Sequence, residues 1–263
     1  MNKYKEFSEL HHQSTPFVLG NVWDVKSAEV MEQQGFKALG TSSAAISHML
    51  GYEDGENLPF DELFFIVKRI AAGTSVPLSV DIEGGYGESV SEIIANIEKL
   101  YHLGVAGINI EDSRVGGERK LLSAEDFSEV IGEVKNHLKQ AGKDLFINVR
   151  TDTFILGIPS ATEETVKRAK LYEQAGVDGL FVPCIVKEQD IRTVISGTLL
   201  PVNVMCMPEL PSFESLAECG VKRISMGNFI HSGLMDIFTE TIKNIRAEGS
   251  FKTLFKNAGH GKG

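Results

Sequence analysis

Eight short apolar runs along the chain alternate with longer amphipathic stretches. Such runs are typical of the buried strands of a parallel sheet, and the stretches carry apolar residues at helical spacing. The expected strands are Phe17–Gly20, Ala38–Thr41, Leu78–Asp81, Gly107–Ile110, Leu145–Val149, Gly179–Val182, Val202–Met205 and Arg223–Ser225. Helical patterns fill most gaps, for instance Lys26–Gln34, Phe60–Ala72, Val90–Leu103, Ala124–Gln140, Glu163–Ala175 and Glu188–Ser196. This alternation predicts repeated βα units.

A recurrent glycine supports the same interpretation. Gly35, Gly104, Gly176 and Gly220 each follow a helical pattern and precede an apolar run, where glycine suits the left-handed residue that closes a helix. Eight strands in 263 residues fit an α/β fold of the (β/α)8 TIM-barrel type, a single domain covering residues 1–263. A doubly wound open sheet is the alternative. The glycine fingerprint of dinucleotide-binding sheets is missing after the first run, where Asn21-Val22-Trp23-Asp24 stands.

The net charge of −10 argues against nucleic acid or an anionic membrane surface as a partner. A small anionic substrate remains compatible, because a local metal ion and an arginine outweigh the global field. The three cysteines form no C-x-x-C pair, which indicates free thiols in a reducing compartment. The N-terminus lacks the pattern of a signal peptide, and no apolar stretch reaches membrane-spanning length. We therefore expect a cytoplasmic protein.

Acidic residues end two neighbouring apolar runs. Asp81 and Glu83 follow the third expected strand, and Glu111 follows the fourth. Adjacent parallel strands lie about 4.8 Å apart, so their carboxyl ends would bring the three carboxylates together. Such carboxylates repel one another unless protons or a cation intervene, and oxygen ligands favour Mg²⁺ or Mn²⁺. The sequence predicts a metal site at Asp81, Glu83 and Glu111; helix caps or solvated loop residues are the alternative.

Other polar residues are expected at the same end of the barrel, where such folds carry their active sites. They are Ser42, Ser43 and Ala44, then Asp54, Arg150 and Asn203. Arg150 could bind a substrate carboxylate through its fork of N–H groups, or form a structural ion pair with Asp152 or Glu111. Ser42 to Ala44 could offer backbone N–H groups to an anion, or simply cap a helix. No histidine spacing suits zinc.

Taken together, these motifs resemble the isocitrate lyase/phosphoenolpyruvate mutase superfamily. They are Asn21-Val22-Trp23-Asp24, Thr41-Ser42-Ser43-Ala44, Gly51-Tyr52-Glu53-Asp54-Gly55, Asp81-Ile82-Glu83-Gly84-Gly85-Tyr86-Gly87, Gly107-Ile108-Asn109-Ile110-Glu111-Asp112-Ser113 and Val149-Arg150-Thr151-Asp152. The resemblance runs from about Phe7 to Ile242. It implies a barrel that binds Mg²⁺ and a 2-oxo acid or related carboxylate and that stabilises an enolate.

The resemblance also implies roles for single residues. Asp81 would hold the metal directly, and Glu83, Glu111 and Asp54 would hold its water molecules. Arg150 would bind the substrate carboxylate. Ser42 to Ala44 would donate backbone N–H groups.

The segment after Glu111 departs from the family pattern. It reads Glu111-Asp112-Ser113-Arg114-Val115-Gly116-Gly117-Glu118-Arg119-Lys120-Leu121-Leu122. It lacks the catalytic cysteine segment of the isocitrate-type lyases and the asparagine of the mutases, although Lys120 could replace the mutase lysine. Lys120 and Arg114 are candidate lid residues, with Gly116-Gly117 as a hinge; a plain solvated loop is the alternative.

The sequence therefore predicts an enzyme: a Mg²⁺-dependent carbon–carbon lyase or decarboxylase acting on a small 2-oxo or 2-hydroxy (di)carboxylate through a metal-stabilised enolate. The alternatives are a phosphonomutase acting on phosphoenolpyruvate-like compounds and a non-catalytic 2-oxo acid binding protein. The resemblance implies a homodimer or homotetramer in which the last helix, Asn228–Ala247, is exchanged between subunits. Its apolar stripe is Phe229, Ile230, Leu234, Ile237, Phe238 and Ile242; the alternative is an ordinary outer helix of the barrel.

Overall fold

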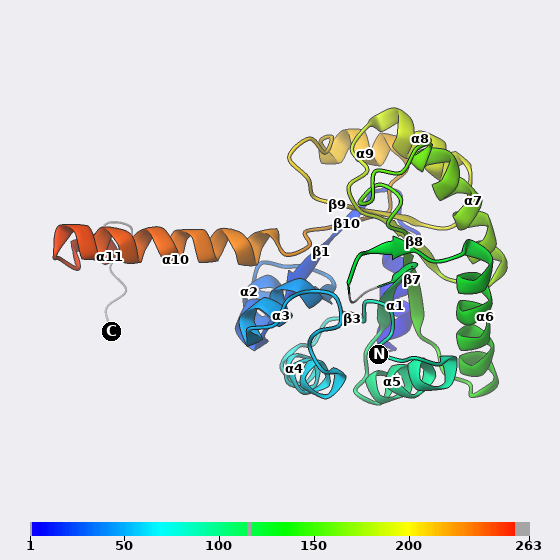
Figure 1. The fold of residues 1–263 in the computed structure, drawn as a ribbon, viewed down its shortest axis with the longest axis horizontal. Helices are drawn as coiled ribbons and strands as arrows, with labels where there is room; N and C mark the ends of the chain where they lie inside the picture. Colours follow the sequence, from blue (N-terminus) through cyan, green and yellow to red (C-terminus); the bar gives the residue numbers. More distant parts are fainter. Residues whose placement is uncertain (1, 115–116, 256–263) are drawn as a thin grey trace. The chain divides into compact units, whose positions relative to one another are not determined.

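The computed structural model describes residues 2–114 and 117–255. Eight parallel strands close into a barrel in the order β1, β2, β3, β4, β7, β8, β9, β10 (Figure 1). Their bounds are β1 Phe17–Val22, β2 Leu39–Thr41, β3 Leu78–Asp81, β4 Gly107–Glu111, β7 Phe146–Arg150, β8 Gly179–Val182, β9 Val202–Met205 and β10 Arg223–Ser225. Two further strands, β5 (Ser113–Arg114) and β6 (Lys120–Leu121), form a separate antiparallel hairpin. The predicted (β/α)8 barrel is confirmed.

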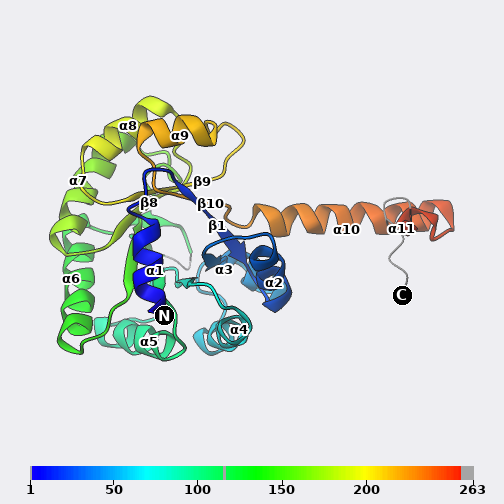
Figure 2. The ribbon, with the colours of Figure 1, turned by 180° about the vertical axis from the view of Figure 1, so that it is seen from behind.

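Helices connect the strands and surround the barrel, as Figures 1 and 2 show. They are α1 Lys3–Leu10, α2 Val25–Gln33, α3 Ser43–Leu50, α4 Phe60–Gly73, α5 Val90–His102, α6 Ala124–Gln140, α7 Ala161–Gln174, α8 Glu188–Ser196 and α9 Phe213–Cys219. Side-chain caps begin α5 at Ser89 and α6 at Ser123, and they satisfy free N–H groups of the first turn. Gly220 closes α9 in the left-handed conformation, as the recurrent glycine predicts.

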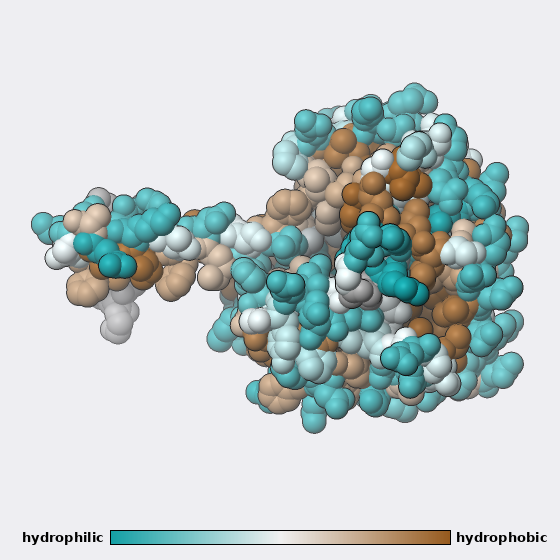
Figure 3. Space-filling model, in the orientation of Figure 1, coloured by the Kyte–Doolittle hydropathy of each residue, from teal (hydrophilic) through white to brown (hydrophobic). Residues whose placement is uncertain are grey.

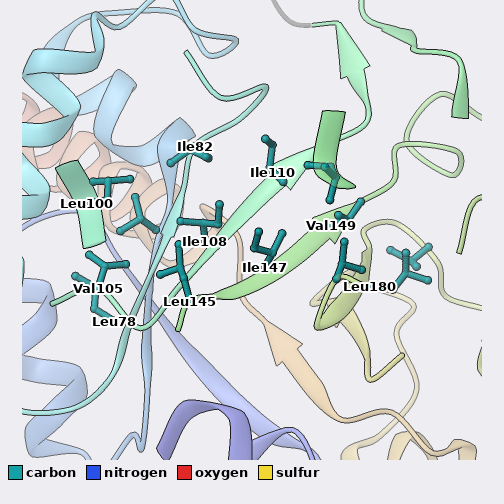
Figure 4. Packing of buried hydrophobic residues seen from close by; sticks show 14 of the residues in the cluster. Leu78, Ile82, Leu100, Val105, Ile108, Ile110, Leu145, Ile147, Val149 and Leu180 are labelled. Carbon is teal, nitrogen blue, oxygen red and sulfur yellow. The ribbon is translucent and has the colours of Figure 1, made fainter. Parts of the chain in front are cut away.

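Alternation along the strands decides which side chains face the barrel interior. Ile108 and Ile110 of β4, with Ile147 and Val149 of β7, belong to the buried apolar cluster that packs against the helices (Figure 4). The intervening residues therefore face the interior. Asn109 pairs in register with Asn148, and Glu111 with Arg150. This register carries an acid and a base to the carboxyl end of the barrel.

A small apolar cluster fills the other end of the barrel. Phe7 of α1 is fully buried and makes edge-to-face contacts with Phe17 and Phe146. A Cβ on Gly107 would lie only 2.8 Å from the Phe146 carbonyl oxygen and 3.0 Å from the Phe7 ring, so glycine permits this close packing. Figure 2 shows α1 from this side.

The chain divides after Gly227 into two compact units, and the second contains α10 (Phe229–Glu248) and α11 (Lys252–Phe255). In α10, the six residues of the predicted apolar stripe are each at least 42% exposed. Exchange of this helix between subunits stays a prediction, and so does the single domain over residues 1–263.

The surface of the barrel unit in Figure 3 is mostly hydrophilic at its rim, with hydrophobic residues nearer the centre of the view. Within residues 2–114 and 117–255, the helices include none with the length and apolar character needed to span a membrane. Cys184, Cys206 and Cys219 are free thiols, as expected.

Candidate active site

The acidic motifs meet where β3, β4 and β7 end. The Glu111 amide donates to the Glu83 carbonyl over 2.8 Å, and the Asp112 amide donates to the Arg150 carbonyl over 3.0 Å. These backbone bonds extend the sheet beyond the strands themselves. Glu83, Glu111 and Arg150 therefore lie at the same edge of the sheet.

Asp81 lies beside the start of α3. The Ser43 hydroxyl donates to Asp81 Oδ2 over 2.9 Å. Ser42 is the N-cap residue of α3, and its hydroxyl accepts from the Ala45 amide at 3.3 Å, as the capping alternative expected. Ser43 and Ala44 form the first turn, whose amides have no acceptor within the helix. Burial, foremost, and the nearby Asp54 raise the pKa of Asp81, although Arg150 opposes the shift.

Glu83 occupies a strained turn after β3. Its φ of 48° and the φ of 55° at Tyr86 are left-handed, a conformation that costs energy in residues with a side chain. Glu83 Oε2 accepts from the Glu56 amide at 2.7 Å, and Oε1 accepts from the Tyr86 hydroxyl at 2.9 Å. Burial, then repulsion by Asp54 and Asp81, raises the pKa of Glu83 to about 7. Asp54, which the sequence also proposed for this site, is exposed in the loop between α3 and α4.

Arg150 forms the ion pairs that the structural alternative predicted. Its Nε and Nη2 donate to Oδ1 and Oδ2 of Asp152 over 2.6 and 3.2 Å, and its Nη1 lies 2.8 Å from Glu111 Oε2. Burial of the Glu111 carboxyl outweighs both arginines around it, and Asp152 and Asp81 add repulsion, so its pKa rises to about 8. Although burial opposes ionisation of Asp152, Arg150 and its other donors hold the pKa of that carboxyl below its ordinary value.

Arg119, which the sequence did not single out, also belongs to this cluster. Its Nη1 lies 2.5 Å from both Glu111 Oε1 and Asp152 Oδ2, and 3.3 Å from the Ser113 hydroxyl. The predicted catalytic residue Lys120 instead has a side chain that is 68% exposed, with Nζ 2.8 Å from Glu118. Successive side chains of an extended segment face opposite sides, so only one of these two neighbours can reach the acids. In the structure it is Arg119, and not Lys120, that contacts the acids, and the catalytic role of Lys120 stays a prediction.

The other candidate lid residue, Arg114, is exposed in β5. Gly116 of the predicted hinge lies outside the described residues.

Asp112 links the start of this hairpin to α7 and to Asp152. Its side chain is fully buried and accepts from Arg168 Nη1 at 2.9 Å, from the Tyr172 hydroxyl at 2.7 Å and from the Asp152 amide at 3.1 Å. Arg168 Nη2 also donates to the Leu122 carbonyl over 2.9 Å. Helix α7 is thereby tied to the hairpin and to the segment that carries Asp152.

The predicted substrate-binding residue Asn203 lies inside the barrel. It is 1% exposed, its Nδ2 donates to the Ser225 hydroxyl over 3.0 Å, and its Oδ1 accepts from Asn148 Nδ2 at 3.3 Å. Asn203 is the second residue of β9, so it is buried below the strand end. Its side chain belongs to this interior polar network, and its contact with substrate stays a prediction.

The acids fit a cation held mainly through water molecules. Within residues 2–114 and 117–255, no group of three or more Asp, Glu, His or Cys side chains is placed to hold a metal ion directly. Asp54 nevertheless raises the pKa of both Asp81 and Glu83, and Asp81 raises that of Glu83, as expected where negative charges gather. Glu111 Oε2 is buried and, despite its ion pair, has no aligned hydrogen-bond donor. This oxygen could accept from a water molecule of a bound ion.

The chain is similar to several known proteins. The sequence model of the family described as phosphoenolpyruvate phosphomutase matches residues 7–246. An uncharacterised protein of Mycobacterium tuberculosis (strain H37Rv) is 34% identical over 226 residues, which cover 86% of this chain and 83% of the relative. An oxaloacetate decarboxylase of Bradyrhizobium sp. (strain BTAi1) is 28% identical over 244 residues, covering 89% and 82%.

A solved structure from Burkholderia cenocepacia J2315, provisionally named a phosphonomutase, superimposes with a TM-score of 0.87 at 35% identity. The superposition covers 92% of this chain and 100% of that chain. The span matched by the family model includes every strand of the barrel and the whole acidic site.

Proposed function

Since the chain belongs to the phosphoenolpyruvate phosphomutase family, we propose that it is a Mg²⁺-dependent (or Mn²⁺-dependent) carbon–carbon lyase or decarboxylase acting on a small 2-oxo or 2-hydroxy (di)carboxylate. Family membership confirms the predicted superfamily and the predicted class of enzyme. One observation carries the finer proposal: the half-buried Asp81 and the buried Glu83 and Glu111, whose pKa values are raised, lie at the strand ends near the cationic side chain of Arg150.

Asp81 is the residue proposed to hold the ion directly, and Glu83, Glu111 and Asp54 are proposed to hold its water molecules. Both oxygens of Glu83 already accept hydrogen bonds, which supports a role through water for that residue. When bound, the ion supplies positive charge that polarises the 2-oxo group and lowers the energy of the enolate.

The chain's own residues would position the substrate. Three of the five N–H groups of Arg150 face Asp152 and Glu111, and its remaining N–H groups are proposed to bind the substrate carboxylate. The amides of Ser43 and Ala44 at the start of α3, with the Ser42 cap, would orient the same carboxylate group. With an oxaloacetate-like substrate, the C3–C4 bond breaks, its electron pair forms the enolate, CO₂ leaves, and C3 then takes a proton.

The similarity to oxaloacetate decarboxylase supports this reaction over isocitrate-type cleavage, because the segment after Glu111 lacks the cysteine that such cleavage uses. A phosphonomutase is the second candidate, favoured by the Burkholderia structure. The loop residues weigh against it, since Lys120 is exposed and no asparagine lies between Asn109 and Asn136. A 2-oxo acid binding protein without turnover is the third.

The test is a panel of 2-oxo acids with MgCl₂, run on wild type, Asp81→Ala and the control Asp61→Ala, an exposed acid of α4. We expect turnover by wild type and the control and a loss of at least about 100-fold in Asp81→Ala. Equal inactivity of wild type and Asp81→Ala on every compound would refute the lyase. Phosphorus NMR with phosphonopyruvate detects the mutase, and calorimetric binding without turnover identifies the binding protein.

A further inference from the structure

The guanidinium of Arg119 is only partly used. Its Nη1 contacts Glu111, Asp152 and Ser113, whereas its Nε and Nη2 make no hydrogen bond or ion pair with the part of the chain that the structure describes. The Nε–H and Nη2–H groups are parallel and form the fork that binds a planar acid group at two points. Arg150 places this same fork on Asp152. In Arg119 the fork is open.

The open fork belongs to a residue that lines a cavity of about 270 Å³. Arg114, Gly117 and Arg119 of the hairpin line one part of this cavity, and residues of the loop that contains Asp54 line the rest. The Arg114 side chain makes no ion pair with the described residues, so the cavity has two guanidinium groups available. The acidic side chains nearby, Glu53 and Asp54, are exposed and their repulsion is screened by solvent.

The charges of the cluster favour a ligand with two acidic groups. The buried carboxylates of Glu111 and Asp152 are balanced by the partly exposed guanidinium groups of Arg119 and Arg150, so the four groups together are neutral when all are ionised. Arg150 has a limited number of N–H groups left and can serve one carboxylate. A second acidic group on the same ligand needs a further donor, and Arg119 is the residue with a free fork beside the same acids.

We propose that Arg119 determines substrate specificity by binding the second acidic group of the substrate, a carboxylate or a phosphonate, through Nε and Nη2. The inference rests on the proposed function, in which Arg150 binds the first carboxylate. Nη1 stays on Glu111 and Asp152 and holds the guanidinium in place. A 2-oxo acid with one acidic group does not contact Nε and Nη2 of Arg119, so its affinity does not depend on this residue.

The test is isothermal titration calorimetry in MgCl₂ with three probes: pyruvate, which has one acidic group, and 3,3-difluorooxaloacetate and phosphonopyruvate, which have two. The fluorinated analogue is used because the proposed reaction would consume oxaloacetate during the titration. The variants are Arg119→Gln, which removes charge and fork, and Arg119→Lys, which keeps the charge. Lys120→Gln is the matched control, because it removes a neighbouring charge that is exposed and paired with Glu118. Thermal melting of each variant verifies the fold.

In Arg119→Gln, we expect the Kd of the two-acid probes to rise about 10- to 100-fold, while the Kd of pyruvate changes less than about twofold. Arg119→Lys should give a smaller rise, and Lys120→Gln should match wild type. A rise for only one of the two-acid probes supports the proposal and identifies the acid group that Arg119 binds.

Equal weakening of all three probes in Arg119→Gln, or unchanged Kd values for both two-acid probes, would overturn the role of Arg119 and leave the proposed function intact. The same loss in Lys120→Gln would also overturn it. Wild-type protein that binds none of the probes would instead contradict the proposed function, and the role of Arg119 would fall with it.

Discussion

Replacing Arg168 by methionine tests how much the buried Arg168–Asp112 ion pair stabilises the fold next to the active site. The substitution removes four contacts: from Nη1 to Asp112 at 2.9 Å and to the Tyr172 hydroxyl at 3.3 Å, from Nη2 to the Leu122 carbonyl at 2.9 Å, and from Nε to Glu164 at 2.8 Å. It also leaves the fully buried Asp112 carboxylate without its cation. Breaking a buried ion pair on one side costs about 3–5 kcal/mol. Because the Tyr172 hydroxyl and the Asp152 amide still donate to Asp112, we expect the lower end, about 3 kcal/mol.

The assay is urea unfolding followed by circular dichroism. Arg192→Met is the control, since Arg192 is 45% exposed and lies 3.9 Å from Glu188, and it should cost under about 1 kcal/mol. The double variant Asp112→Asn/Arg168→Met removes the stranded charge, so it should be less destabilised than the sum of the single variants by at least about 1 kcal/mol. If Arg168→Met lowered the free energy of unfolding no more than Arg192→Met does, the stabilising role of the Arg168–Asp112 ion pair would be refuted. Simple additivity in the double variant would refute it as well.

Two further predictions concern ionisation. Burial, with Arg223 nearby, lowers the pKa of His11 to about 3 from 6.5, so the folded protein keeps this ring neutral while the unfolded chain binds a proton below pH 6.5. The free energy of unfolding should therefore decrease by up to about 1.4 kcal/mol per pH unit as the pH is lowered from 6.5 to 3. Urea unfolding of His11→Phe should lack this part of the pH dependence. Retention of the full wild-type slope in His11→Phe would contradict the prediction. Tyr86→Phe removes the hydroxyl that donates to Glu83 and should raise the pKa of that carboxyl further. Calorimetric Mg²⁺ titration should then show the midpoint of the pH dependence of binding moving upward by about one pH unit, whereas an unchanged or lower midpoint would count against Glu83 as a metal-site residue.

The strands could be predicted because both faces of a parallel barrel strand are buried or near the site, which leaves short apolar runs between amphipathic helices. The bounds of β3, β8, β9 and β10 agree with the prediction, and β1 continues two residues further, to Val22. Helices α1 and α9 were not predicted. Helix α1 buries Phe7 alone, and α9 has seven residues, so neither offers a sustained helical period.

Within the site, the sequence located the residues that end a strand, because Asp81, Glu111 and Arg150 each occupy the last position of one. At the hairpin the sequence did not indicate that Arg119, and not Lys120, contacts the acids, since strands of two residues carry no periodic signal that distinguishes the two. The sequence also did not reveal the interior hydrogen bonds of Asn203, because an amide on the inner face of a strand has the same local pattern whether it contacts substrate or other interior amides. Only the packed barrel distinguishes these environments.

The central claim is that the acids at the ends of β3 and β4 share one divalent ion beside Arg150. The most direct measurement is a crystal structure with MnCl₂ and pyruvate, in which the anomalous signal locates the ion. We expect one peak about 2.1 Å from an Asp81 carboxylate oxygen. Glu83 and Glu111 should bind the water molecules of the ion, and pyruvate should lie between the ion and Arg150. Absence of a peak at Asp81, with Glu111 still held by Arg119 and Arg150 as it is without ligand, would contradict it.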